Sequence, residues 1–389
     1  MSNFNMGPKV HFGVGELKEL RNINCKRAFI VTDPFMVTSG FINKVTDHLE
    51  AASISYEIFS EVVPDPPLEV VSKGIKAMDK FNPDALIAMG GGSAIDASKA
   101  ISYFRALVKK GLSPDAEVKK PLFIAIPTTS GTGSEVTAFS VITDKKLNVK
   151  YPLVEEEMVP DMAILDAELV KSVPASITAD TGIDVLTHAI EAYVSTKNSD
   201  FTDALAEKAI KLVFNYLPKA YNNGEDLEAR EKMHNASCIA GIAFTNSSLG
   251  VNHSMAHILG GRFHIPHGKA NALVLPYVIE YNANIKSMNR NEYTKAAERY
   301  AEIARFLGLT SSNSVREGVR VLINAVKNLI KSVGIPNKIK DLGISSKDFE
   351  DNLNDLAEIA LQDGCTATNP REPKVEELKE LFKKVYNGI

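Results

Sequence analysis

Residues 84–100, DALIAMGGGSAIDASKA, contain the transition that decides the fold class. The run from Asp84 to Met89 is mostly apolar, as in a buried strand, and the glycines that follow permit a tight turn into a helix. Further strand-like runs lie at 27–32, 54–59 and 122–126, and helix-like stretches lie at 68–80 and 94–104. Strands that alternate with helices predict a mostly parallel sheet covered by helices over residues 1–176.

Residues 177–389 have a purely helical pattern. The clearest segment, 314–333, starts with the capping-box pair Ser314 and Glu317 and ends at Gly334, with apolar residues at helical spacing between. Other helices are predicted at 180–195, 252–261, 291–307 and 349–360. The fold class predicted is therefore an α/β domain, residues 1–176, followed by an all-α domain, residues 177–389.

The composition of the 389 residues excludes several classes of protein. With 44 Lys and Arg against 48 Asp and Glu, the chain does not bind nucleic acid through bulk positive charge. Three cysteines, far apart and without a CxxC, fit neither a disulfide framework nor a thiolate zinc site, and they suit a reducing cytoplasm. The N-terminus lacks the basic start and apolar run of a signal peptide.

Residues 233–261 contain no Asp, Glu, Lys or Arg. The stretch is long enough for a membrane span, but its Asn, Ser, Thr and His residues are too polar for lipid. We therefore expect this stretch to form buried helices around a polar site, and we expect no association with a membrane.

Two polar loops follow strands of the predicted sheet. Gly90 to Ser93 joins a strand to a helix, where glycines let a phosphate approach free backbone N–H groups. The loop 127–135, PTTSGTGSE, follows the next strand at the edge where such sheets bind ligands. Neither loop has the GxGxxG pattern, and each has a plain reading as a turn, but together they favour phosphate binding.

Asp33 follows the strand 27–32. Its carboxylate could accept hydrogen bonds from both ribose hydroxyls and repel a 2′-phosphate, which would favour NAD over NADP. It could equally cap the loop before Pro34, and the residues alone leave both roles open.

Two pairs of polar residues with helical spacing predict a metal site. Asp184 and His188 stand four residues apart, as do His253 and His257, and this spacing puts each pair on one face of a helix. His267 follows shortly after. One carboxylate and three imidazoles form a mixed oxygen and nitrogen site of the kind that binds divalent iron or zinc.

Each of these side chains could instead be an ordinary buried polar group. Their joint occurrence in a region with so few charges favours a shared partner, because unpaired buried polar groups cost free energy. His264 competes for the metal, and the local pattern does not decide between the histidines.

The order of these motifs resembles that of the iron-dependent (group III) alcohol dehydrogenase family, from Phe12 to Arg371. The most specific part is Asp184-x-x-x-His188, followed by Asn252-His253-x-x-x-His257-x-x-Gly260-Gly261 and His267-Gly268. The chain is similar to short-chain primary-alcohol dehydrogenases of fermenting bacteria and to the alcohol-dehydrogenase half of bifunctional aldehyde–alcohol dehydrogenases.

The resemblance implies a Rossmann-like dinucleotide-binding domain, a helical catalytic domain, and hydride transfer between NAD(H) and short primary alcohols or aldehydes. It implies one Fe²⁺, with Zn²⁺ as the alternative, and a cytoplasmic homo-oligomer. By resemblance His257 is a proton relay rather than a ligand, and Cys365 belongs to a structural segment. The metal ligands implied are Asp184, His188, His253 and His267. The cofactor contacts implied are Asp33, Asp65, Gly91, Gly92, Ser93, Asp96, Thr128, Thr129, Thr132, Val141 and Lys150.

Two other functions fit parts of the pattern. A lyase similar to dehydroquinate synthase would also use NAD and a divalent metal, but its phosphorylated acid substrate demands basic residues that 233–261 does not contain. A non-catalytic protein that binds nucleotide or metal is the other alternative.

Overall fold

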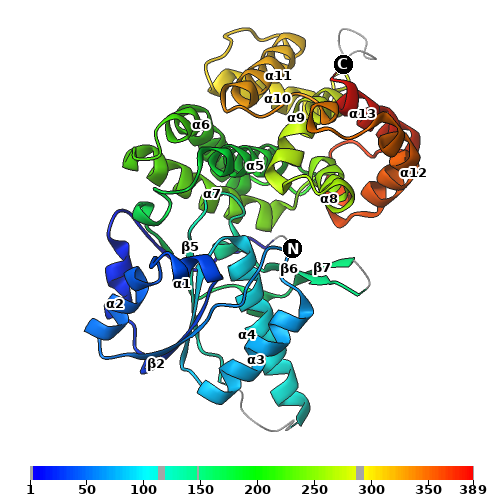
Figure 1. Ribbon diagram of the computed structural model, residues 1–389. Helices are drawn as coiled ribbons and strands as arrows, with labels where there is room; N and C mark the ends of the chain where they lie inside the picture. The colour runs from blue at the N-terminus through cyan, green and yellow to red at the C-terminus, as the bar shows by residue number, and fades with distance from the viewer. Residues whose placement is uncertain (1–2, 113–118, 147–148, 286–292, 389) are drawn as a thin grey trace. The chain divides into compact units, whose positions relative to one another are not determined.

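The computed structural model describes residues 3–112, 119–146, 149–285 and 293–388, without the side chain of Lys150. It consists of two compact units, residues 5–172 and residues 173–389 with the first four residues (Figure 1). Within the described residues, no helix combines the length and the apolar character needed to cross a membrane. The prediction of an α/β unit followed by a helical unit is confirmed.

The α/β unit contains a six-stranded sheet in the order β1-β8-β5-β4-β2-β3, with every neighbouring pair parallel. Four strands lie where the sequence predicts them, and the sequence pattern missed β1 and β8. The strands are β1 (Lys9–Phe12), β2 (Arg27–Val31), β3 (Ser55–Phe59), β4 (Ala85–Gly90), β5 (Leu122–Pro127) and β8 (Met162–Leu165).

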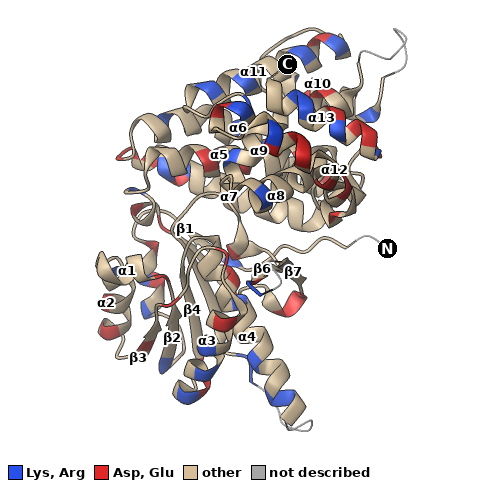
Figure 2. Ribbon diagram, turned by 45° about the vertical axis from the view of Figure 1, so that its right-hand side comes forward, with Lys and Arg blue, Asp and Glu red and all other residues tan. Residues whose placement is uncertain are grey.

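Helices cover both faces of this sheet. Successive side chains of a strand point to opposite faces, and both sets are apolar here, so each face needs a layer of helices to bury it. Ile30 of β2 packs in one core with Val45 and Leu49 of the helix α2. Its neighbour Phe29 packs in the other core with residues of α3 and α4. Figure 2 shows α1 and α2 on one side of the strands and α3 and α4 on the other. These helices are α1 (Pro34–Thr38), α2 (Asn43–Ala51), α3 (Leu68–Phe81) and α4 (Gly92–Leu112).

A separate antiparallel hairpin, β6 (Phe139–Asp144) with β7 (Val149–Val154), follows the second polar loop. It was not predicted. Thr143 of β6 also donates its N–H to the carbonyl oxygen of Pro66 at 2.9 Å, which joins the hairpin to the loop before α3.

The helical unit begins with α5, in which every residue from Gly182 to Val194 is buried. The predicted cap of α11 is present, since the Ser314 hydroxyl accepts the N–H of Glu317 at 3.3 Å. The helix predicted from 291 begins at Lys295, because Thr294 caps it, and 291–292 lie outside the described residues. The helices are α5 (Ala175–Val194), α6 (Asp200–Asn222), α7 (Leu227–Ser247), α8 (Val251–Phe263), α9 (His267–Ala283), α10 (Lys295–Phe306), α11 (Val315–Ser332), α12 (Ser346–Gln362) and α13 (Val375–Asn387).

Candidate functional site

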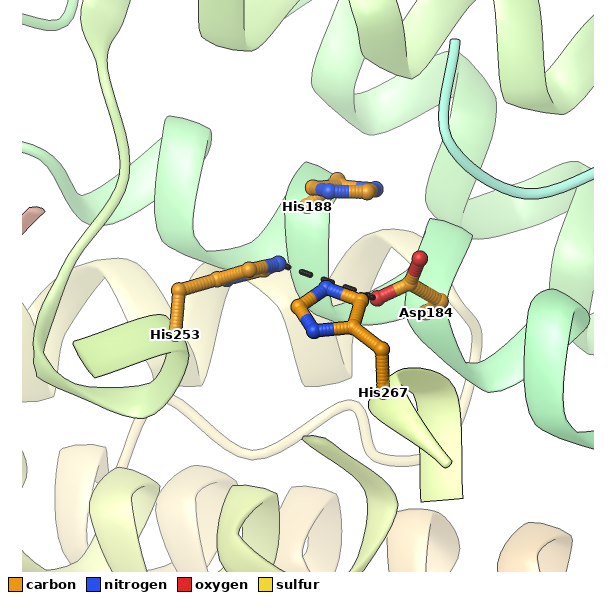
Figure 3. Close-up of side chains that lie close together, drawn as sticks. All are labelled: Asp184, His188, His253 and His267. Carbon is orange, nitrogen blue, oxygen red and sulfur yellow. Dashed lines mark ion pairs between the residues drawn. The ribbon is translucent and has the colours of Figure 1, made fainter. Parts of the chain in front are cut away.

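Four side chains from three helices converge in the helical unit (Figure 3). Asp184 and His188 lie one turn apart on α5, His253 lies on α8, and His267 is the first residue of α9. One possible ligand atom from each lies within 4.8 Å of those of the other three. His264, the competitor, ends α8 in the left-handed conformation and is not in this group.

Asp184 is the centre of the group. Its Oδ1 lies 3.4 Å from Nε2 of His267 and 3.7 Å from Nε2 of His253. The rings of His188 and His253 stack, with centroids 4.6 Å apart. Asp184 and His253 are almost wholly buried, whereas the side chain of His267 is 42% exposed, so the group is open to solvent on one side.

Burial and neighbouring charges shift the pKa of three groups of the site. Burial opposes ionisation of Asp184, but the imidazoles of His188, His267 and His253 hold the pKa of its carboxyl well below the usual range. Burial lowers the pKa of His188 to about 3. At His253 burial acts in the same direction, but the carboxylates of Glu191 and Asp184 outweigh it and raise the pKa to about 9. The two buried carboxylates therefore favour a positive charge between them.

Glu191 orients the ring of His253. One carboxylate oxygen of this buried side chain hydrogen-bonds Nδ1 of His253, and the other accepts the backbone N–H of Asn252 at 2.7 Å. With Nδ1 occupied, Nε2 is the nitrogen that faces Asp184. Metal-binding histidines commonly donate their other ring N–H to a carboxylate, which fixes the orientation of the ring in this way. The only signal for Glu191 in the sequence is an acid close after Asp184 and His188 in a mostly apolar helix.

Asn271, one turn after His267 on α9, was also missed. Its Nδ2 lies 2.7 Å from Oδ1 of Asp184, 3.1 Å from Nε2 of His253 and 3.2 Å from Nε2 of His267. Its Oδ1 accepts a hydrogen bond from Nδ2 of Asn252 at 2.9 Å, which fixes the orientation of the amide. The amide nitrogen therefore lies within hydrogen-bond distance of three of the four donor groups, and its two hydrogens serve two of them at a time.

These residues fit a divalent metal. One carboxylate oxygen and three imidazole nitrogens suit Fe²⁺ or Zn²⁺. The buried Nδ1 of His188 has no hydrogen-bond partner within the described part of the chain, and a buried polar atom in that state costs free energy. The donor set and this nitrogen are both consistent with a bound cation.

His257 lies one turn after His253 but outside the four-residue group. Its Nδ1 is 2.8 Å from Oδ2 of Asp363, and its ring stacks on that of His267 at 5.4 Å between centroids. The backbone N–H of Cys365 donates to Oδ1 of Asp363 at 2.9 Å. Burial opposes ionisation of Asp363, but the bonds to His257 hold the pKa of its carboxyl low. Nothing in the sequence pattern pointed to Asp363.

In the α/β unit the two predicted phosphate loops lie against each other. A Cβ placed on Gly92 would lie 2.8 Å from the side chain of Thr132, and one placed on Gly91 would lie 3.4 Å from that of Thr129. A Cβ at Gly92 would therefore force the Thr132 side chain to move, whereas the contact at Gly91 is an ordinary one. Ser93 is in the first turn of α4, and Thr128 follows the last residue of β5.

Asp96 holds the second loop in place. Its Oδ1 accepts the hydroxyl of Ser134 at 2.6 Å, and its Oδ2 accepts the backbone N–H of Val141 at 3.0 Å. Lys150 pairs with Thr143 in the hairpin. Asp65 lies in the loop before α3, with φ of 52°, next to Pro66, whose carbonyl oxygen contacts β6.

Asp33 caps a helix and also lies near the glycine loop. Its Oδ1 accepts the N–H groups of Phe35 at 2.9 Å and Met36 at 3.1 Å. Its Oδ2 would lie 3.5 Å from a Cβ on Gly90. The cap uses one carboxylate oxygen and leaves the other directed to the glycine loop.

A fully buried lysine, missed by the sequence analysis, fixes α4 to the second loop. Nζ of Lys99 donates to Oγ of Ser134 at 2.9 Å, to Oγ1 of Thr137 at 3.1 Å and to the carbonyl oxygen of Phe139 at 2.7 Å. Burial lowers the pKa of Lys99 to about 8. Burial likewise raises the pKa of Glu135, the last residue of the second loop, to about 7.

Comparison with known proteins gives consistent matches along the whole chain. Residues 7–167 match the family model described as iron-containing alcohol dehydrogenase, and residues 178–386 match that of the C-terminal part of the Fe-containing alcohol dehydrogenase family. The NADPH-dependent butanol dehydrogenase of Clostridium saccharobutylicum is 44% identical over 100% of this chain and 99% of its own length.

The chain also matches part of a longer protein and two solved structures. The bifunctional aldehyde-alcohol dehydrogenase of Escherichia coli K12 is 43% identical over 93% of this chain, which spans only 43% of that protein. An iron-containing alcohol dehydrogenase from Thermococcus thioreducens has a TM-score of 0.89 and 37% identity, with all of both chains covered. A sulfoacetaldehyde reductase from Bifidobacterium kashiwanohense, solved with NAD⁺, has a TM-score of 0.85 and 32% identity over 99% of this chain and 98% of its own.

Proposed function

The chain belongs to the iron-containing alcohol dehydrogenase family and is an alcohol–aldehyde oxidoreductase, and we propose that it interconverts short-chain primary alcohols and aldehydes with NAD(H). The observation that carries the proposal is the convergence of Asp184, His188, His253 and His267. They would hold one divalent metal, Fe²⁺ or Zn²⁺. The relatives do not favour the lyase alternative.

The metal, when bound, supplies Lewis-acid polarisation of the alcohol or aldehyde oxygen. The chain's own part is to hold the ligands in one arrangement. Glu191 sets the ring of His253, and the amide of Asn271 sets the carboxylate of Asp184. When the imidazole nitrogens bind a cation they must give up their contacts with the amide, since each has one lone pair, whereas the Glu191 contact at Nδ1 of His253 is kept.

His257 and Asp363 would move the proton of the reaction. Alcohol oxidation releases one proton together with the hydride, and an imidazole is suited to accept it near neutral pH. The Asp363 carboxylate at Nδ1 of His257 leaves Nε2 as the nitrogen that exchanges this proton. The 44% exposure of the His257 side chain lets the proton reach solvent.

The α/β unit would bind the dinucleotide. Gly91, Gly92 and Ser93 would contact the pyrophosphate, with Thr128, Thr129 and Thr132 beside them. The proximity of Asp33 to Gly90 supports a preference for NAD, since a 2′-phosphate at the adenosine ribose would place like charges together. The butanol dehydrogenase relative is named for NADPH, so this preference requires its own test.

Asp65, Val141 and Lys150 would complete the cofactor contacts. We also propose that the protein is a cytoplasmic homo-oligomer, since its three widely spaced cysteines without a CxxC suit a reducing compartment.

The test is net oxidation of NADH by aldehydes of two to four carbons, with protein purified anaerobically and analysed for metal. We expect one NADH consumed per aldehyde. His253→Ala should lose both metal and turnover, whereas His48→Ala, in the other unit, should keep both. A lyase that recycles its NAD would give no net loss of NADH, and that result would overturn the proposal.

A further inference from the structure

A second set of metal-ligating atoms lies beside the first in the helical unit. One ring nitrogen of His257, a carboxylate oxygen of Asp363 and Sγ of Cys365 all lie within 4.8 Å of one another. We propose that these three residues form a second cation site, which takes a thiophilic divalent ion of the Zn²⁺ class and thereby inhibits the enzyme. The inhibition, but not the binding, rests on the proposed role of His257.

The site is built before any cation binds. Asp363 precedes the short 3-10 helix Gly364–Thr368, and its Oδ1 is held by the N–H of Cys365 and by the hydroxyl of Ser254, at 3.2 Å. Ser254 is itself buried and hydrogen-bonded by Thr366 at 2.7 Å. The bonds to Oδ1 leave Oδ2 directed at His257, 2.8 Å from its Nδ1.

The donor set selects the kind of ion. One thiolate and one carboxylate balance the two charges of a divalent cation, and the imidazole binds in its neutral form. Sulfur and imidazole ligands favour Zn²⁺, Co²⁺ or Cd²⁺ over Mg²⁺ and Ca²⁺, which prefer oxygen. When the ion binds, the Cys365 thiol gives its proton to solvent and a sulfur–metal bond forms, while the proton of His257 moves from Nδ1 to Nε2 and frees Nδ1 for the ion. Three protein ligands leave a coordination position for water.

The two sites differ in a way that an experiment can detect. The first group, Asp184 with His188, His253 and His267, contains no sulfur, whereas the second contains Cys365. The exposed side chain of His257 gives the second site access to solvent. An ion there would bind Nδ1 of His257 and the carboxylate of Asp363, which otherwise hydrogen-bond each other. The His257–Asp363 pair could then no longer transfer the proton of the reaction.

The test adds Co²⁺ to enzyme whose first site is already filled, because a thiolate bound to Co²⁺ gives a charge-transfer absorption in the near ultraviolet. We expect one equivalent of this band per chain, abolished in Cys365→Ser. It should persist in Cys25→Ser, which removes a half-buried thiol that is in none of the candidate groups found in the described residues. Asp363→Asn should weaken Co²⁺ binding at least tenfold.

Zn²⁺ should displace the band and slow NADH oxidation over the same concentration range, and Cys365→Ser should require at least tenfold more Zn²⁺ for the same inhibition. Absence of the band in the wild type, or its persistence in Cys365→Ser, would overturn the site. A normal band with no inhibition would overturn the inhibitory role alone. Since the band does not depend on turnover, its outcome is separate from that of the alcohol dehydrogenase assay.

Discussion

The buried carboxylate of Glu191 determines which nitrogen of His253 faces Asp184. It occupies Nδ1 of the ring on one side, and it also accepts the N–H of Asn252, the residue before His253. The carboxylate therefore fixes both the ring and the start of α8 that carries it. Removing its charge would leave the ligand in place but free to turn.

We expect Glu191→Gln to weaken binding of the first metal by about 10- to 100-fold, the usual effect of removing a partner of a metal ligand. Competition with a chelator of known affinity measures this. Glu376→Gln, at a side chain that is 82% exposed, is the matched control. Wild-type affinity in Glu191→Gln would show that Glu191 does not position His253.

Asp33→Asn separates the two roles of Asp33, because Asn caps a helix as well as Asp does but carries no charge. We expect α1 to remain capped and the ratio of kcat/KM for NADPH to that for NADH to rise at least tenfold. An unchanged ratio would show that the Asp33 carboxylate does not select the cofactor. Asp47→Asn, on the neighbouring helix α2, should leave the ratio as in the wild type.

The raised pKa of Glu135 predicts a dependence of stability on pH. Between the ordinary value of 4.5 and about 7, the folded chain keeps a proton that the unfolded chain has released. The free energy of unfolding therefore falls as the pH rises through this range, and Glu135→Gln removes that part of the fall. Denaturant unfolding at several pH values measures the difference between wild type and variant.

A difference between wild type and Glu135→Gln that stays constant from pH 4.5 to 7 would contradict the shift.

At the scale of elements, Gly268 lets α9 approach α5. A Cβ at this position would lie 2.1 Å from the carbonyl oxygen of Asp180, one turn before Asp184. Backbone cannot move aside as a side chain can, so the two helices would have to separate. His267 adjoins Gly268, so its position relative to Asp184 depends on this contact.

Gly268→Ala should destabilise the protein by about 1–3 kcal/mol, as overpacking does, and should weaken metal binding. Gly261→Ala is the control, since a Cβ there meets nothing within 4 Å. Denaturant unfolding measures the stability of both variants, and competition with a chelator measures their metal affinity. Equal stability and metal affinity in the two would contradict the role of this contact.

The elements that were predicted have a strong local pattern, although no bounds were predicted for α6, α7, α9 and α13. The strand, glycine turn and helix around Gly90 follow from composition and spacing, as does α11 from its Ser314 cap. The strands β1 and β8 are four residues each and pair across the length of the α/β unit, from Lys9 to Met162. Such short strands carry too little pattern to be recognised without their partners.

At the scale of the whole molecule, the site too depends on partners that are distant in the sequence. Spacing of four residues places Asp184 with His188 and His253 with His257, but only the packing of α5, α8 and α9 brings the two pairs and His267 together. Asp363 comes from a segment more than a hundred positions after His257 and has no motif of its own. The sequence therefore predicts the ligand candidates but not the residues that orient them.

The most direct test of the central claim is the rate of NADH oxidation with propanal as metal-free protein is titrated anaerobically with Fe²⁺. The account predicts no turnover without metal and a linear rise that saturates at one ion per chain. Asp184→Asn should show no such rise. Full turnover in protein shown to be free of metal would contradict the claim.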